Sequence, residues 1–172
     1  MSKAVLLSIK PKYCELIASG KKTVEVRKTR PKIDTPFKCY IYMTAENASY
    51  PVKINGVPMM CHNNGGKCII GEFVCDTIIT DRTFGHDPMF NALSCMSDAE
   101  IAAYCTNKEM YGFHISDLII YDKPRELSEF YRECEKPECE DCPNLFYEVF
   151  CCYDEKIPIT RPPQSWGYVE EL

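Results

Sequence analysis

Apolar and polar positions follow regular patterns along this chain, and the first segment predicts a strand followed by a short helix. The run Ala4–Ile9, apolar at every position except Ser8, is typical of a strand that is buried on both faces. Pro11 suits the first turn of a helix, where its missing N–H is not needed, and Gly20 suits the helix end, where a left-handed residue is favoured. We therefore expect a buried strand, a short helix and a return of the chain at Gly20.

A second strand is expected from Lys22 to Lys28, because apolar and polar residues alternate there. Val24 and Val26 share one face, which we expect to lie in the core. Thr23, Glu25 and Arg27 share the other face. This strand therefore presents an acid and a base side by side.

The remaining pattern predicts several strands and one more helix. Strands are expected over residues 37–43, over 68–79 with a bend at Gly71, over 113–121 and from 166 onward, together with a hairpin that turns at Asn55-Gly56. Ser97 and Glu100 form a capping-box pattern that begins a short helix, and a polar loop precedes it. Because strands and helices do not alternate regularly, we expect an α+β fold with a mainly antiparallel, barrel-like sheet.

Length and composition agree with one globular domain over residues 1–172, since 45% of the residues are apolar and 26% are charged. No apolar run reaches the 18 residues that a membrane-spanning helix needs, and the five apolar residues before Lys10 are too few for a signal-peptide core. We therefore expect no membrane partner and a cytoplasmic location. In that reducing compartment, the 12 cysteines would remain free thiols or bind metal.

Charge is unevenly distributed along the chain. Residues 1–32 hold nine basic and two acidic side chains, a net charge of +7, whereas the remainder holds 11 basic and 23 acidic ones, a net charge of −12. A basic pole on an acidic body suits a phosphate-bearing ligand, while a solvated lysine-rich face explains the same pattern without any ligand.

The segment Gly20-x-Lys22-x-x-Glu25-x-Arg27 follows Ser8-Ile9-Lys10-Pro11 and a short helix. In that setting it resembles the signature of the ASCH domain family of the PUA-like superfamily. The segments 111–118 and 162–166 are similar to those of small bacterial and phage members. The resemblance implies an open, mixed or antiparallel β-barrel with flanking short helices, and a cleft beside the first helix that binds RNA or a nucleotide-like ligand.

The resemblance and the side-chain chemistry together give the candidate site residues. Lys10, Lys22 and Arg27 are expected to contact phosphate, with Lys21 beside them, while Glu25 orients Arg27 or accepts from a base amine. His114 is expected to reach the cleft, and Trp166 to stack on a base.

Other readings of these residues remain open. Glu25 can simply form a structural ion pair with Lys22 or Arg27. In a hydrolytic enzyme, either a ribonuclease or an amidohydrolase, Lys22 and Glu25 would be the catalytic acid and base. Family members that resemble amidohydrolases carry a threonine at the position of Glu25, so their activity is not transferred to this chain. A third possibility is a module that binds a protein partner.

A cysteine-rich segment at residues 134–152 offers the spacing of a metal site. We expect Cys134, Cys139 and Cys142 to bind a structural Zn²⁺, with Cys151 or its neighbour Cys152 as the fourth ligand. An iron–sulfur cluster and a set of reduced thiols without metal are the alternatives. The cysteines at positions 14, 39, 75, 95 and 105 are expected to be small core residues.

Overall fold

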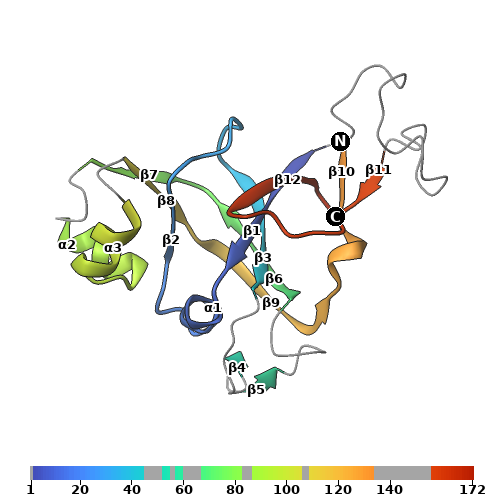
Figure 1. Cartoon of the computed structure of the whole chain (residues 1–172), viewed down its shortest axis with the longest axis horizontal. Coiled ribbons are helices and arrows are strands. Elements are labelled where there is room, and N and C mark those ends of the chain that lie inside the picture. Colours follow the sequence, from blue (N-terminus) through green and yellow to red (C-terminus); the bar gives the residue numbers. More distant parts are fainter. Residues whose placement is uncertain are drawn as a thin grey trace.

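The computed structural model shows a small core of twisted sheets with helices at its sides (Figure 1). It describes residues 2–44, 52–54, 57–59, 67–82, 87–105, 109–133 and 156–172. The helices are α1 (Pro11–Ala18), α2 (Pro88–Ser94), α3 (Asp98–Cys105) and the 3₁₀ turn η1 (Leu127–Glu129). The strands are β1 (Lys3–Ile9), β2 (Val24–Arg27), β3 (Phe37–Met43), β4 (Val52–Ile54), β5 (Val57–Met59), β6 (Cys68–Cys75), β7 (Ile78–Asp81), β8 (Met110–His114), β9 (Ser116–Arg125), β10 (Tyr131–Glu133), β11 (Lys156–Pro158) and β12 (Trp166–Glu170).

Two sheets organise the described part of the chain. The larger has the order β12-β1-β3-β6-β9, and the smaller has the order β2-β8-β7. Strands β1 and β3 are parallel, whereas every other pair in these sheets is antiparallel. Among the described residues no hydrogen-bonded ladder joins β9 to β12, so the larger sheet stays open. The expected α+β fold with a mixed, open sheet arrangement is confirmed.

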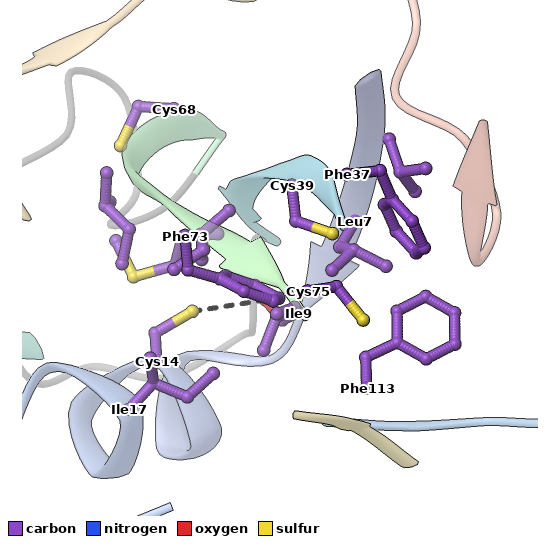
Figure 2. Packing of buried hydrophobic residues seen from close by; sticks show 14 residues of the cluster. Leu7, Ile9, Cys14, Ile17, Phe37, Cys39, Cys68, Phe73, Cys75 and Phe113 are labelled. Atoms are coloured by element: carbon purple, nitrogen blue, oxygen red, sulfur yellow. Dashed lines mark hydrogen bonds between the residues drawn. The ribbon is translucent and has the colours of Figure 1, made fainter. Parts of the chain in front are cut away.

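Strand β1 is buried on both faces, as its apolar run predicts. Leu7 and Ile9 belong to a core cluster that also contains residues of α1, β3 and β6, while Leu6 belongs to a second cluster on the opposite face of the sheet. Figure 2 shows the first cluster, in which Cys14, Cys39 and Cys75 lie among aliphatic and aromatic side chains. These three buried free thiols behave as the small core residues that the sequence predicts.

The helix after β1 follows the sequence pattern closely. It begins at Pro11, and Gly20 takes the left-handed conformation, with a φ of 71°. The capping box of α3 is also present, since the N–H of Ser97 donates to Glu100 and the N–H of Glu100 donates to the Ser97 hydroxyl. Strands β4 and β5 pair in antiparallel fashion with Ile54 opposite Val57, while the expected turn at 55–56 lies outside the described residues.

Each of two long strands expected from the sequence is divided into two shorter strands, one in each sheet. The apolar pattern of 68–79 divides into β6 and β7, and that of 113–121 falls on β8 and β9. Strand β6 pairs with β9 in the larger sheet, and β7 pairs with β8 in the smaller one. Both segments therefore pass from the larger sheet to the smaller one or back. The pattern of apolar residues does not reveal these bends, because it continues without interruption where the chain changes sheet.

Helix α2 lies in a region where the sequence predicts a polar loop, and that prediction is wrong. The Asp87 carboxylate accepts hydrogen bonds from the N–H groups of Met89 and Phe90, and Pro88 occupies the first turn. Phe90 is buried against β2 and β8, where a side chain on Gly112 would come within 2.7 Å of the Phe90 ring. The Asp-Pro pair is a helix-start signal that was available in the sequence.

Helices α2 and α3 cover one face of the smaller sheet (Figure 1). None of the helices within the described ranges combines the length and apolar character needed to cross a membrane. Cys68 differs from the expectation of free or metal-bound thiols, because it is disulfide-bonded.

Candidate functional site

The Gly20–Arg27 motif joins the end of α1 to β2. The backbone N–H of Lys22 donates to the Leu16 carbonyl oxygen at 3.0 Å, so the chain turns back tightly on the helix. On β2, Val24 and Val26 pack against α2 and α3. Glu25 and Arg27 occupy alternate positions and therefore face the other way, as the pattern predicts.

Lys22, Glu25 and Arg27 form a buried ion triad. They are 2%, 4% and 7% exposed. Arg27 Nη2 lies 3.1 Å from Glu25 Oε1, and Lys22 Nζ lies 3.3 Å from Glu25 Oε2. Glu25 is thus held between two cations, and the triad carries a net charge of +1.

Backbone oxygens hold both cations of the triad from other elements. Lys22 Nζ donates to the carbonyl oxygen of Ser94, at the end of α2, at 2.7 Å, and lies 4.9 Å from the centre of the Tyr13 ring. Arg27 Nη2 donates to the carbonyl oxygen of Ser8, in β1, at 2.9 Å. Arg27 Nε is buried and makes no hydrogen bond with any described residue. Glu25 Oε2, which forms the ion pair with Lys22, likewise makes no hydrogen bond with a described residue, so the triad keeps one unused donor and one unused acceptor.

The triad lies at a cavity of about 800 Å³. The walls come from the end of β1, from α1, from β2 and the residues after it, from α3, and from the segment before β12. Four cations and two anions line it, namely Lys10, Lys22, Arg27, Lys28, Glu25 and Glu100. Lys10 and Lys28 are exposed, so the cavity has cations both at its mouth and in its buried part.

Two tyrosines add aromatic surface to the cavity. Tyr13 on α1 and Tyr104 on α3 both line it and are half-buried. Lys28 Nζ lies 4.8 Å from the centre of the Tyr104 ring. Burial raises the pKa of Tyr13.

An ion pair connects the two helices that flank the cavity. Lys12 Nζ on α1 lies 2.7 Å from Glu100 Oε1 on α3. The hydrogen bond from Lys12, together with those from Ser97, lowers the pKa of Glu100 to about 2. This carboxylate is therefore ionised and paired at neutral pH.

Four of the seven residues expected to bind ligand line this cavity, and three lie elsewhere. Lys10, Lys22, Glu25 and Arg27 are brought together. The other three are placed outside its lining, namely Lys21, His114 and Trp166.

Each of these three has its own surroundings. Lys21 is exposed, and its carbonyl oxygen accepts from the Cys95 thiol at 3.3 Å. His114 Nδ1 lies 2.7 Å from a carboxylate oxygen of Asp76, at the corner between the two sheets. Trp166 Nε1 donates to the hydroxyl of Thr29 at 3.0 Å, and Thr29 lines the cavity. Trp166 therefore supports a wall residue from outside.

Sequence analysis did not place Tyr13, Lys28, Glu100 or Tyr104 in the site. In the sequence, Lys28 belongs to the basic segment, and Glu100 belongs to the capping box of a helix. Their position depends on α3 lying across the cavity from α1, and no local pattern in the sequence encodes that contact.

The predicted zinc ligands Cys134, Cys139, Cys142 and Cys151 fall outside the described residues. In the described parts of the chain, no three metal-binding side chains of the His, Cys, Asp or Glu type come together. The zinc site at 134–152 stays a prediction.

Comparison with known proteins agrees with the resemblance seen in the sequence. The family model of the ASCH domain matches residues 7–158. No curated protein matches the chain. The crystal structure of ASCH from Zymomonas mobilis superposes with a TM-score of 0.60 at 18% sequence identity, covering 98% of this chain and 88% of that one. A tyrosine-to-phenylalanine mutant of that protein gives a TM-score of 0.61 at 18% identity, with 99% and 92% covered.

At 18% identity the superpositions show a shared fold, and the family model shows family membership. The Gly20–Arg27 motif lies within the matched segment, and its Lys22, Glu25 and Arg27 line the cavity between α1 and α3. The chain belongs to the ASCH domain family.

Proposed function

We propose that the cavity binds RNA or a nucleotide-like ligand. The observation that carries this proposal is the buried triad, which places two cations against one carboxylate and leaves Arg27 Nε without a partner. A net charge is costly to bury, and a ligand with an anionic or acceptor group compensates it. Family membership adds support, since ASCH domains resemble RNA-binding modules.

The cations of the cavity divide into two functional groups under this proposal. The exposed Lys10 and Lys28 contact phosphate at the mouth, where they keep long, solvated side chains. Arg27 lines the buried part of the cavity and attracts an anionic group of the ligand through its guanidinium charge. Lys22 is already bonded to Ser94, so it acts through its charge and by holding Glu25 in place.

Glu25 is a positioning residue in this account. Its two oxygens lie 3.1 Å from Arg27 and 3.3 Å from Lys22, so it orients both cations. The aromatic faces of Tyr13 and Tyr104 provide surface on which a base stacks, an interaction worth about 1–3 kcal/mol per base.

The proposal is tested by titrating the protein with a fluorescently labelled RNA of eight nucleotides and, by calorimetry, with ribonucleoside 5′-monophosphates. Lys10→Ala is compared with Lys123→Ala, because both lysines are exposed and only Lys10 lines the cavity. We expect Lys10→Ala to weaken binding of either probe several-fold and Lys123→Ala to leave it unchanged. Absence of binding by the unmodified protein, or equal losses in both variants, contradicts the proposal.

The same mixtures show whether the chain is an enzyme. The Lys22–Glu25 pair lines the cavity, where an acid and a base would act on a bound ligand. Chromatography of the RNA and nucleotides after incubation detects any shortened or altered product. Turnover that disappears in Glu25→Gln, while the fold persists, would make Glu25 a catalytic residue; intact ligand restricts the cavity to binding.

A further inference from the structure

The connection between β2 and β3 carries three exposed cations at alternate positions. They are Lys28, Arg30 and Lys32. Lys28 lines the cavity, whereas Arg30 and Lys32 lie beyond its lining. The exposed cations therefore begin at the candidate site and continue along the connection beyond its lining.

The residues between these cations attach the connection to the rest of the protein. Thr29 accepts a hydrogen bond from Trp166 at 3.0 Å, and Pro31 is buried. The backbone N–H of Lys32 donates to the Tyr168 hydroxyl at 2.7 Å. Both aromatic residues belong to β12, which crosses the middle of Figure 1 and pairs with β1.

The two anchoring rings also support each other. The rings of Trp166 and Tyr168 pack edge to face, with their centres 5.4 Å apart. The cations are therefore carried by backbone that is fixed before any ligand arrives. Fixing a binding surface in advance lowers the entropy that is lost on association.

The positive charges of Lys28, Arg30 and Lys32 are largely not neutralised by described acidic residues. No described acidic residue forms an ion pair with Lys28 or Lys32. Arg30 lies near Glu109, whose pKa is lowered by a hydrogen bond from Tyr111 and by the charges of Arg82 and Arg30. Because Arg82 already pairs with Glu109 at 2.8 Å, the group as a whole keeps one positive charge.

From this arrangement we propose that the ligand is an RNA strand rather than a mononucleotide, and that its backbone runs from the cavity over Lys28, Arg30 and Lys32. The proposal rests on the proposed function and extends it, since a single nucleotide in the cavity would reach only the first of these cations. A strand of several phosphates would release a counterion at each contact.

The test compares RNA strands of one, two, four and eight nucleotides, each titrated at several salt concentrations. Arg30→Ala/Lys32→Ala is compared with Lys123→Ala/Arg132→Ala, which removes one lysine and one arginine from exposed positions outside the cavity. Net charge changes equally in the two proteins. We expect the unmodified protein to bind the octamer at least about tenfold more tightly than the mononucleotide, as added phosphate contacts require.

In Arg30→Ala/Lys32→Ala this preference for length should be lost, while binding of the mononucleotide stays the same. The slope of the logarithm of affinity against the logarithm of salt concentration should decrease by about 1.4, since each lost contact to a single strand accounts for about 0.7. Equal affinity for all lengths, or an unchanged slope in this variant, overturns the proposal. So does an equal loss in Lys123→Ala/Arg132→Ala.

A second pair of variants tests the anchoring without changing charge. Trp166→Phe keeps a ring but removes the donor to Thr29, and Tyr168→Phe removes the acceptor of the Lys32 N–H. Tyr168→Phe should weaken binding of the octamer and leave the mononucleotide unaffected, whereas Trp166→Phe, whose partner Thr29 lines the cavity, should weaken binding of both. An unaffected octamer would contradict the role of the fixed backbone.

The two proposals fail in different ways. If the mononucleotide binds and longer strands bind no better, the cavity is a nucleotide site and the row of cations is not part of it. If neither probe binds, the proposed function and the extended surface are both wrong.

Discussion

Two clusters of charged side chains in this protein have opposite balances of charge. At the cavity, Lys22 and Arg27 share the single carboxylate of Glu25, and all three are at most 7% exposed. On β3 and β6, Lys38 lies 3.3 Å from Glu72 and 3.6 Å from Glu171, with side-chain exposures of 22%, 18% and 35%. The second cluster has excess negative charge and is open to water.

The second cluster also includes a hydrogen bond from a neighbouring hydroxyl. The Tyr121 hydroxyl donates to Glu72 at 2.5 Å, and Lys38 pairs with the same carboxylate. The cavity triad, in contrast, keeps the Nε donor of Arg27 unbonded within the described residues. A partly exposed cluster with excess negative charge stabilises the sheet to which it belongs, whereas a buried one with excess positive charge is suited to an anionic ligand.

The largest effect is expected from removing the shared carboxylate of the buried triad. Glu25→Gln leaves two buried cations without a counter-charge, which costs about 3–5 kcal/mol when one partner of a buried pair is lost. Urea unfolding measures the change in the free energy of unfolding. Glu72→Gln is the matched control, and its loss should stay at about 1 kcal/mol, because water still reaches the partly exposed pair with Lys38. Equal losses would remove the distinction between the two clusters.

A smaller effect is expected at Tyr121. Tyr121→Phe removes a hydrogen bond to Glu72 and should lower the free energy of unfolding by about 1 kcal/mol at neutral pH. Burial, followed by that hydrogen bond, raises the pKa of Tyr121 well above its usual range. The unfolded chain ionises near pH 10, so the stabilisation is complete below that pH and is lost as the pH rises further.

The measurement is the difference in unfolding free energy between the unmodified protein and Tyr121→Phe, taken from pH 8 to pH 11. We expect this difference to decrease above about pH 10. A difference that stays constant over the whole range would show that the hydroxyl of Tyr121 has its ordinary pKa.

The smallest effect is expected at the ion pair between α1 and α3. The Lys12 hydrogen bond is the main cause of the low pKa of Glu100, about 2. Because this folded-state pKa lies below the unfolded one, the stabilisation is present above about pH 4.5 and is lost as the pH falls toward 2. Both side chains are exposed, so Lys12→Ala should cost less than about 1 kcal/mol.

Nuclear magnetic resonance of the Glu100 carboxyl carbon gives the direct readout of this pair. In Lys12→Ala the midpoint of its titration should move toward the ordinary glutamate value. A midpoint that stays near 2 would assign the low pKa to Ser97 alone.

The sequence predicted the parts of this fold that depend on neighbouring residues. The buried strand β1, the left-handed Gly20 and the Ser97 cap each follow from a few adjacent positions. The faces of β2 were also predicted, because alternation alone separates Val24 and Val26 from Glu25 and Arg27.

The rest depended on contacts between distant segments. No local pattern shows that the 68–79 and 113–121 runs change sheets, or that α3 brings Tyr104 and Glu100 to the cavity. His114 and Trp166 were assigned to the cleft from their chemistry, but the bend after β8 and the Thr29 hydrogen bond place them outside the lining. Burial of the Lys22 ammonium was likewise not visible in the sequence, since lysine is usually exposed.

The most direct test of the excess charge in the cavity is a comparison of Lys22→Met with Lys38→Met. Each change removes one ammonium group and keeps a side chain of similar length, at the buried and at the exposed cluster respectively. Affinity is measured with the labelled RNA octamer, and circular dichroism checks that both variants stay folded. Lys22→Met makes the triad neutral, so we expect its affinity to fall by about tenfold or more, while Lys38→Met binds like the unmodified protein. Unchanged affinity in Lys22→Met, or equal losses in both variants, would contradict the account.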